Sequence, residues 1–418
     1  MTQPIIYWFR NDLRLRNNEA LNRAVSQKQP ILFVYLFDEA QDADTGLGFK
    51  RMSGDRRTFL ENTLFELKKS LAEHGHSLHI FYGNPLHIFQ ELVRIHKPTG
   101  VFAQAEYAHE EKLLEAQVAA MVPLHLTFGS TLFTPDSVPF PIEKSPFYYT
   151  AFLNKVSVLP LETTAQGALS EAKAYDVHNS TLATYQIQSK PFYIPAGEEV
   201  ARQKVLEYVS SSAIDDYVTS RELFMGDHYS TFWSPYLVLG VINVREVVAM
   251  IQKHAGHRES AQPSVQKLME QLIWREYYRF LMLRYGSRLF WRHGLRNKNR
   301  DRHDDREAFD KWRLGETGSP LIDAFMKELL QTGFLSNRGR MLAAYYLAKV
   351  MEVNWLWGAQ WFESALVDYD VCNNYGNWAY QSGTGTDSRV NRRFNIEKQI
   401  SKFDPKLEYI NKWNKPYL

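Results

Sequence analysis

Apolar and polar positions alternate over residues 1–130 in a way that predicts strands separated by helices. Residues 53–74 carry apolar side chains at helical spacing, with Ser53 as the N-cap candidate and Gly75 as the C-cap candidate. Strand and helix in alternation predict an α/β domain built on a doubly wound parallel sheet. The short apolar runs that we expect to form its strands lie at residues 5–9, 31–37, 78–82, 101–103 and 124–128.

After residue 130 the sequence pattern changes at two points, first in composition and then in periodicity. Residues 131–198 are rich in Pro, Ser and Thr, which is typical of a connector that wraps over the surface. Helical periodicity dominates residues 199–418 and predicts an all-α domain. Its clearest helix spans residues 264–285, with Ser264 as the N-cap candidate and Gly286 just past its end. One face of this helix carries Gln271, Trp274, Arg275 and Tyr278.

Charge and composition exclude several classes of protein. The chain carries 49 Lys+Arg against 47 Asp+Glu, so any basic surface must be local. The single Cys372 excludes a disulfide framework and an iron–sulfur or zinc site held by several thiolates. Neither a signal peptide nor an apolar run long enough to span a bilayer is evident. We therefore expect a cytoplasmic monomer that uses no membrane and no metal.

Residues 368–385 read DYDVCNNYGNWAYQSGTG and combine carboxylates, side-chain amides, aromatic rings and glycines. A buried amide or carboxylate without a partner costs about a few kcal/mol, so this density favours a binding site over an ordinary core segment. A solvated surface loop is the simpler alternative. Trp378 and Tyr380 argue against it, because solvated loops seldom carry such large aromatic side chains.

Two further features suit a ligand that carries phosphate. Ser230, Thr231 and Ser234 lead into a predicted helix start, where hydroxyls and free N–H groups favour phosphate. An ordinary capped helix is the alternative there. Basic residues gather at residues 288–306 and again at 389–398. Cations beside stacking aromatic rings are typical of single-strand nucleic-acid binding, although charged helix faces more often serve only solvation.

Four segments of the chain resemble the photolyase and cryptochrome family, and in particular its cryptochrome DASH branch. The resemblance covers essentially the whole chain. It implies a photolyase-like fold, in which the α/β domain precedes an all-α domain that binds FAD, and it implies DNA as the partner. The segments are YWFRNDLRLRNN at 7–18, QLIWRE at 271–276, GETGSPLIDAFMKELLQTGFLSNRGRM at 315–341 and VDYDVCNNYGNW at 367–378.

The resemblance also implies roles for individual residues. Arg340 would pair with Asp368, Asn374 would face flavin N5, and Asp370 would accept from the flavin N3–H. The residues that would hold FAD are Tyr217, Ser230, Thr231, Trp233, Ser234, Gln271, Arg275, Asn337, Arg340, Asp368, Asp370 and Asn374. The catalytic residues would be Asn374, Arg340, Asp368, Gln271, Trp274, Met341 and Tyr380. The contacts to DNA would come from Arg221, Arg338, Arg392 and Arg393.

Light harvesting and electron supply are implied in the same way. The α/β domain of the family holds an antenna chromophore, often a reduced folate such as methenyltetrahydrofolate. Doubly wound sheets bind ligands beyond the carboxyl ends of their strands. Trp378 and Trp355 match the inner members of the family's electron relay, whereas Arg302 takes the place of the outer Trp, so the usual relay is shortened. The antenna residues would be Phe37, Asp38 and Glu106.

The implied activity is blue-light-dependent repair of cyclobutane pyrimidine dimers in single-stranded DNA, by electron transfer from excited reduced FAD. Position 271 departs from the family's Glu, which hydrogen-bonds the damaged thymine, since Gln271 can donate a hydrogen bond but no proton. This departure predicts that Gln271→Glu raises the repair yield. Three alternatives stay open: a blue-light photoreceptor without efficient repair, repair of (6-4) lesions although Asn337 replaces a catalytic His, and a light-independent nucleotide-binding protein.

Overall fold

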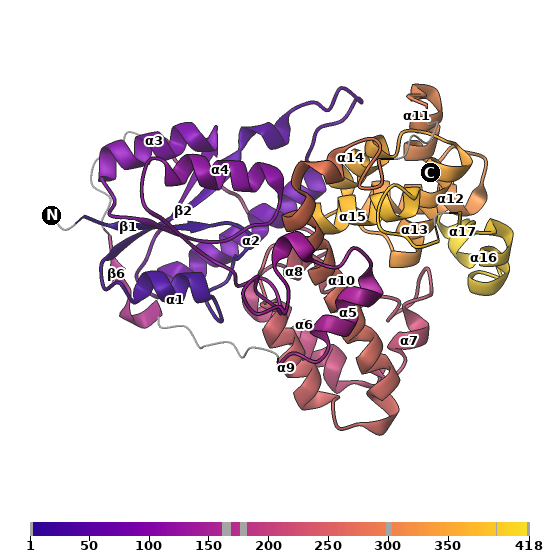
Figure 1. Ribbon diagram of the computed structural model, residues 1–418, viewed down its shortest axis with the longest axis horizontal. Coiled ribbons are helices and arrows are strands. Elements are labelled where there is room, and N and C mark those ends of the chain that lie inside the picture. The colour runs from indigo at the N-terminus through magenta and orange to yellow at the C-terminus, as the bar shows by residue number, and fades with distance from the viewer. Residues whose placement is uncertain (1–2, 161–168, 176–181, 298–302, 390, 416–418) are drawn as a thin grey trace.

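The computed structural model describes residues 3–160, 169–175, 182–297, 303–389 and 391–415. A parallel sheet lies at one end of the molecule and a helical domain at the other (Figure 1). The strand order is β3-β2-β1-β4-β5, and each of these neighbouring pairs is parallel. The strands are β1 (Ile5–Phe9), β2 (Pro30–Asp38), β3 (Leu78–Gly83), β4 (Val101–Gln104) and β5 (Leu124–Thr127).

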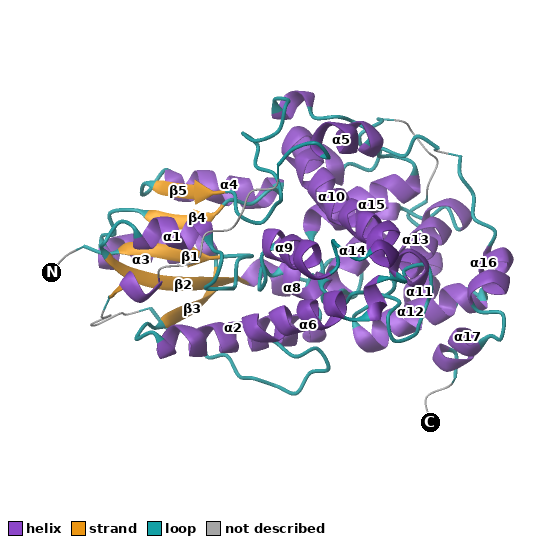
Figure 2. Ribbon diagram, turned by 90° about the horizontal axis from the view of Figure 1, so that it is seen from below, coloured by secondary structure: helices purple, strands orange, loops and turns teal. Residues whose placement is uncertain are grey.

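Helices cover both faces of the sheet, which confirms the doubly wound α/β domain (Figure 2). Side chains alternate along β1, so that Tyr7 and Phe9 pack on one face while Ile6 and Trp8 pack on the other. The predicted connector contributes a short strand, β6 (Lys173–Ala174), which pairs with the start of β2. The flanking helices are α1 (Glu19–Val25), α2 (Gly54–Glu73), α3 (Pro85–His96) and α4 (His109–Ala119).

The helical domain is organised around α10 (Gln262–Tyr285), which is continuously buried from Glu276 to Met282. Its start differs from the prediction, because the helix begins at Gln262 and Ser264 does not cap it. The Ser264 hydroxyl instead donates to the Asp215 carbonyl at 2.7 Å and accepts from the Val218 N–H at 3.0 Å, which holds α10 against α7. The other helices are α5 (Tyr149–Val156), α6 (Glu198–Ser210), α7 (Tyr217–Ser220), α8 (Ser234–Val238), α9 (Val244–His254), α11 (Arg306–Leu314), α12 (Pro320–Thr332), α13 (Asn337–Tyr345), α14 (Trp355–Ala365), α15 (Val371–Ser382), α16 (Ile396–Phe403) and α17 (Glu408–Trp413).

The loop after β1 joins the two domains. The Leu13 N–H donates to the Leu239 carbonyl at 3.0 Å, and the buried Arg14 guanidinium donates to the Gly240 carbonyl at 2.8 Å. Gly240 has a φ of +62°, and a Cβ at this position would lie 2.0 Å from the Asn11 carbonyl oxygen. Only glycine permits so close an approach. The junction therefore fixes how the helical domain sits against the sheet.

Within the described ranges, no helix is long and apolar enough to cross a bilayer. In the same ranges, no group of His, Cys, Asp and Glu side chains is arranged to hold a metal ion. The domain bounds at residues 130 and 198 stay predictions.

Gly240→Ala is expected to lower the melting temperature by about 5 °C, because a methyl group would meet the Asn11 backbone as well as a left-handed φ. The matched control is Gly46→Ala, since Gly46 has a φ of +75° but no atom within 4 Å of the added Cβ. Its melting temperature should fall by only about 1–2 °C. Equal shifts in the two variants would show that the domain junction does not depend on this contact.

Candidate functional site

Helices α13 and α15 contribute to the walls of a small cavity of about 80 Å³, called here the inner cavity. Arg340 donates to Asp368 Oδ2 at 2.9 Å, which forms the predicted ion pair. The Asp368 side chain is 2% exposed, and its second oxygen has no hydrogen-bond partner among the described residues. The buried indole N–H of Trp378, in the same wall, also has none among them. A buried acceptor and a buried donor without partners indicate that the cavity suits a polar ligand.

Asp370 lies at the start of α15 and joins that helix to α10. Its Oδ1 accepts from the Asn373 backbone N–H at 2.8 Å, and its Oδ2 accepts from the Arg279 guanidinium at 3.1 Å. Burial would raise the pKa of Asp370, but the guanidinium groups of Arg279 and Arg275 hold it below its usual range. Asp370 therefore stays ionised in the wall of the inner cavity.

Asn374 is held in place by α14. Its side-chain Nδ2 donates to the Ala359 carbonyl at 2.9 Å, and the residue is 8% exposed. Helix α14 can approach this closely because Gly358 faces Trp378, where a Cβ would lie 2.2 Å from the Trp378 ring. The contact fixes both Asn374 and Trp378 in the wall of the inner cavity.

A larger cavity of about 430 Å³, called here the outer cavity, adjoins the inner one. The predicted face of α10 forms part of its wall, so the structure brings Gln271, Trp274, Arg275 and Tyr278 together. The two cavities share Asn337, Met341, Asn373, Asn377 and Gln381 as wall residues. The outer cavity is also lined by Tyr217, Arg221, Tyr229, Ser230, Thr231, Lys267, Tyr380 and Arg392.

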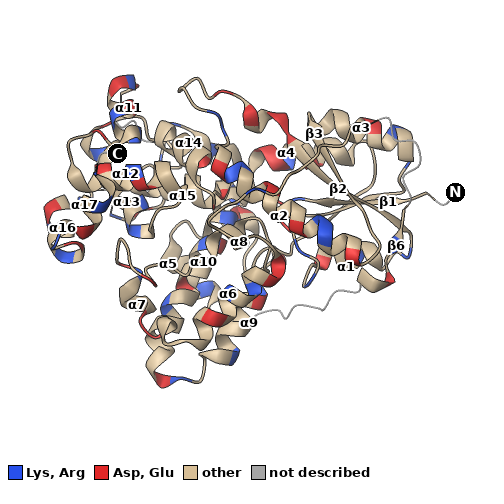
Figure 3. Ribbon diagram, turned by 180° about the vertical axis from the view of Figure 1, so that it is seen from behind, with Lys and Arg blue, Asp and Glu red and all other residues tan. Residues whose placement is uncertain are grey.

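The described residues that line the outer cavity include positively charged side chains but no negatively charged ones. Among the described residues neither Asp nor Glu lines it, whereas Arg221, Lys267, Arg275 and Arg392 do. Along the ribbon of the described residues, basic and acidic residues are interspersed (Figure 3). Burial, assisted by the neighbouring Arg279, lowers the pKa of Arg275 to about 10, so that Arg275 remains charged at neutral pH. Such a cavity favours anions, including the phosphates of a nucleotide or a nucleic acid.

Aromatic rings give the outer cavity a surface for a planar group. Trp274 stacks on Tyr149 with ring centroids 3.6 Å apart and meets Tyr380 edge-on at 5.9 Å. Met341 lies in the same wall. Rings and a thioether around a polar cavity suit stacking of a nucleic-acid base. Tyr149 was not predicted, since it lies in the connector, and no local pattern marks it as a neighbour of Trp274.

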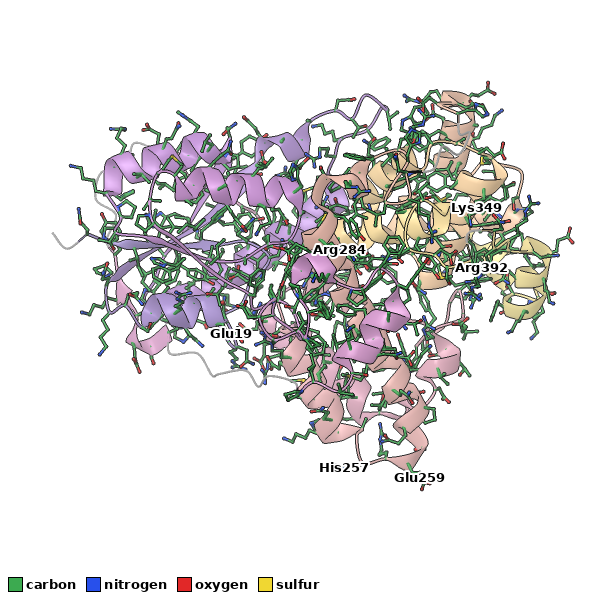
Figure 4. All side chains as sticks on the ribbon, in the orientation of Figure 1. Glu19, His257, Glu259, Arg284, Lys349 and Arg392 are labelled. Atoms are coloured by element: carbon green, nitrogen blue, oxygen red, sulfur yellow. The ribbon has the colours of Figure 1, made fainter. Side chains whose placement is uncertain are left out.

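Several predicted contact residues lie outside the cavity walls. Trp233 is 1% exposed and Ser234 begins α8, and neither lines the two cavities. Arg393 is exposed, and Arg338 is held by an ion pair with Glu222 rather than lining the outer cavity. In the same region, Figure 4 shows Arg392 beside Lys349, whose Nζ donates to the Arg392 carbonyl at 3.3 Å.

The tryptophans of the predicted electron relay are both buried. Trp355 is 0% exposed, and its N–H donates to the Arg292 carbonyl at 3.0 Å. Trp378 meets Trp312 edge-on with ring centroids 5.8 Å apart. Arg302, which stands at the outer relay position, lies outside the described residues.

A third cavity of about 610 Å³, the interdomain cavity, opens between the sheet and the helical domain. Of the three predicted antenna residues, Asp38 and Glu106 line this cavity, whereas Phe37 does not, because the neighbouring position on a strand faces the opposite side and Phe37 is 0% exposed in the sheet core. Burial and the nearby Glu111 raise the pKa of Glu106 to about 8, against the opposing effect of Arg10 and Arg279. The cavity is also lined by residues that no sequence pattern marked, because they come from separate segments: Arg10, Arg51, Arg56, Glu111 and Tyr369.

Comparison with known proteins decides the family. The model described as DNA photolyase matches residues 5–167, and the one described as the FAD binding domain of DNA photolyase matches residues 268–416. Cryptochrome DASH of Synechocystis is 34% identical over 98% of this chain and 87% of its own length. The chain belongs to the photolyase and cryptochrome family. Cryptochrome DASH of Arabidopsis thaliana, a chloroplastic and mitochondrial protein, is 35% identical over 98% of this chain and 75% of its own length.

Solved structures of photolyases and cryptochromes share the fold. The crystal structure of Synechocystis cryptochrome matches with a TM-score of 0.93 at 32% identity, covering 99% of this chain and 89% of that one. An archaeal photolyase from Sulfolobus tokodaii, solved with two FAD molecules, matches with a TM-score of 0.81 at 26% identity over 99% of this chain and 90% of that one. The photolyase fold, an α/β domain followed by a helical FAD-binding domain, is therefore confirmed, and the residue roles stay predictions.

The raised pKa of Glu106 makes stability depend on pH. Because its pKa of about 8 in the folded protein exceeds the value of an unfolded Glu, stability is full at low pH and falls as pH rises through the folded pKa. Glu106→Gln removes this loss, so we expect the variant to melt several degrees above the unsubstituted protein at pH 8.5 and at nearly the same temperature at pH 5. Glu110→Gln, which replaces an exposed carboxylate, is the control and should leave the melting temperature unchanged at both pH values. If Glu106→Gln changed the melting temperature by the same amount at pH 5 and at pH 8.5, the raised pKa of Glu106 would be contradicted.

Proposed function

We propose that the chain is a blue-light-dependent flavoprotein that repairs cyclobutane pyrimidine dimers in single-stranded DNA. The observation that carries the proposal is the pairing of the two adjoining cavities. The outer one has a cationic wall with no carboxylate among the described residues, and the inner one has buried polar atoms without partners among them. The first suits a phosphate-bearing strand with a flipped-out base, and the second suits the polar edge of a flavin ring. The photolyase and cryptochrome relatives support both assignments.

The residues of the two cavities fit FAD. Ser230, Thr231 and Arg275 offer hydroxyl and guanidinium donors for the pyrophosphate. Asp368 and Asp370 offer acceptors to the flavin ring, since each carboxylate oxygen can accept more than one hydrogen bond. FAD held in its reduced form would supply, under blue light, the electron that opens the cyclobutane ring and that is afterwards returned to the flavin.

The chain's own side chains bind and orient the damaged strand. Trp274 and Tyr380 present rings on which the flipped bases stack, and Met341 fills the space between the lesion and the inner cavity. Lys267 places positive charge near the dimer as it gains negative charge, and a fixed charge in a partly buried cavity needs no reorganisation to stabilise it. Arg221, Arg338, Arg392 and Arg393 would bind phosphates on either side of the lesion.

The antenna and the electron relay are finer parts of the proposal. A reduced folate such as methenyltetrahydrofolate would occupy the interdomain cavity near Asp38 and Glu106. A flavin is the second candidate, because the Sulfolobus photolyase was solved with two FAD molecules. Trp378 and Trp355 would carry electrons to the flavin when it is oxidised. A cytoplasmic location and a monomeric state stay predictions, and some cryptochrome DASH relatives are chloroplastic and mitochondrial.

A blue-light photoreceptor is the second candidate function, favoured by Gln271, which lines the outer cavity where the family places a Glu. The experiment that separates the two uses reduced, flavin-loaded protein and a single-stranded oligonucleotide with one thymine dimer. We expect the dimer to disappear under blue light and to persist in the dark. Bound flavin with a dimer that survives illumination would contradict repair and favour the photoreceptor. The same assay with a (6-4) lesion in place of the thymine dimer tests the alternative that the chain repairs (6-4) lesions.

Trp274→Ala is expected to weaken binding of the dimer-containing oligonucleotide about tenfold, because one stacking surface is lost, while flavin content stays unchanged. The measurement is fluorescence anisotropy in the dark, together with the flavin absorbance of each preparation. Trp413→Ala is the matched control, since Trp413 packs on Tyr409 and lines neither cavity. Equal affinities of the two variants would show that the dimer does not bind against Trp274.

A further inference from the structure

The side-chain amide of Gln271 is held in one orientation by Arg221. The Arg221 guanidinium donates to Gln271 Oε1 at 2.9 Å, across the wall of the outer cavity. A guanidinium has donors only, so the atom that faces it must be the amide oxygen and not the nitrogen. A rotation of the amide by half a turn would set two donors against each other. The contact therefore fixes which end of Gln271 is available to a ligand.

Arg221 is itself fixed from the other side. Its Nη1 donates to Glu222 Oε1 at 3.1 Å, and Glu222 also forms an ion pair with Arg338. The Arg221 side chain is 15% exposed, so it is largely shielded from water. The orientation of the Gln271 amide thus depends on a short chain of charged contacts that starts at Glu222.

What remains for a ligand at this position is a pair of N–H donors. Within the part of the chain that the structure describes, no hydrogen bond uses Gln271 Nε2. In the same part of the chain no carboxylate lines the outer cavity, so no anionic acceptor stands beside this amide. A base edge placed against Gln271 would meet donors and would need to present an acceptor.

We propose that Gln271, oriented by Arg221, selects pyrimidines that carry a carbonyl oxygen at position 4 over those that carry an amino group there. The inference rests on the proposed function, because it takes the ligand of the outer cavity to be a flipped pyrimidine dimer. Thymine and uracil present an acceptor at position 4, whereas cytosine presents a donor. Two N–H donors that face each other lose the hydrogen bonds that each made to water and gain no partner. Arg221 is a positioning residue in this reading, and Gln271 makes the contact.

The same geometry reverses the expectation that Gln271→Glu improves repair of thymine dimers. A carboxylate at position 271 would lie against Arg221, which would keep its pKa low and the group ionised. An ionised carboxylate only accepts hydrogen bonds. The Glu variant should therefore bind a thymine dimer less well and a cytosine dimer better than the unsubstituted protein does.

The test is binding in the dark by flavin-loaded protein, with single-stranded oligonucleotides that carry a thymine dimer or a freshly prepared cytosine dimer. We expect the thymine dimer to bind about tenfold more tightly. Arg221→Met should bring this ratio close to one, because the freed amide can turn, and Arg221→Lys should restore part of it. Gln271→Glu should invert the ratio.

Arg338→Met is the matched control, because Arg338 shares Glu222 with Arg221 but has no hydrogen bond to Gln271 among the described residues. It should weaken both oligonucleotides equally and leave the ratio unchanged. An equal loss for both oligonucleotides in Arg221→Met would overturn the proposal and leave Arg221 as a phosphate contact alone. A thymine preference without light-driven repair would support this selection and contradict the repair function. If the protein repaired the thymine dimer but bound both dimers equally, the proposed selection by Gln271 would be overturned and the repair function would stand.

Discussion

The buried ion pair between Asp370 and Arg279 is the contact on which the site depends. Asp370 caps α15 and lies in the wall of the inner cavity, while Arg279 reaches from α10 to the Ser130 carbonyl at 2.7 Å. The pair therefore holds together the two helices that build the cavities and the segment that leads out of the α/β domain. Removing one partner of such a pair leaves a buried charge unmatched and costs about 3–5 kcal/mol.

Close helix packing turns this arrangement into two cavities of different character. Gly376 lets α15 lie directly against α10, since a Cβ there would come within 2.2 Å of the Tyr278 ring. The carboxylates of Asp368 and Asp370 line the inner cavity, whereas the cations Arg221, Lys267, Arg275 and Arg392 line the outer one. One cavity can thus hold a neutral ring with polar edges while the other attracts phosphate. This separation of charge agrees with membership in a family of DNA-binding flavoproteins.

The sheet was predictable because parallel strands buried on both faces appear as continuous apolar runs. The α10 face and the Arg340–Asp368 pair were predictable as well, the first from helical spacing and the second from family resemblance. Ser264 was misassigned because its hydroxyl bonds to residues outside its own helix, which no local cap signal reveals. The contact of Arg221 with Gln271 joins segments far apart in sequence, as does the convergence of Arg10 and Tyr369 on the interdomain cavity, and no local pattern in a single sequence predicts either.

The most direct measurement is a crystal structure of the flavin-loaded protein with a single-stranded oligonucleotide that carries one thymine dimer. We predict electron density for the flavin ring against Arg340, Asp368 and Asn374, and density for the flipped dimer between Trp274 and Tyr380. Flavin confined to the interdomain cavity, or a dimer bound on the surface with the outer cavity empty, would contradict the division of roles between the inner and outer cavities.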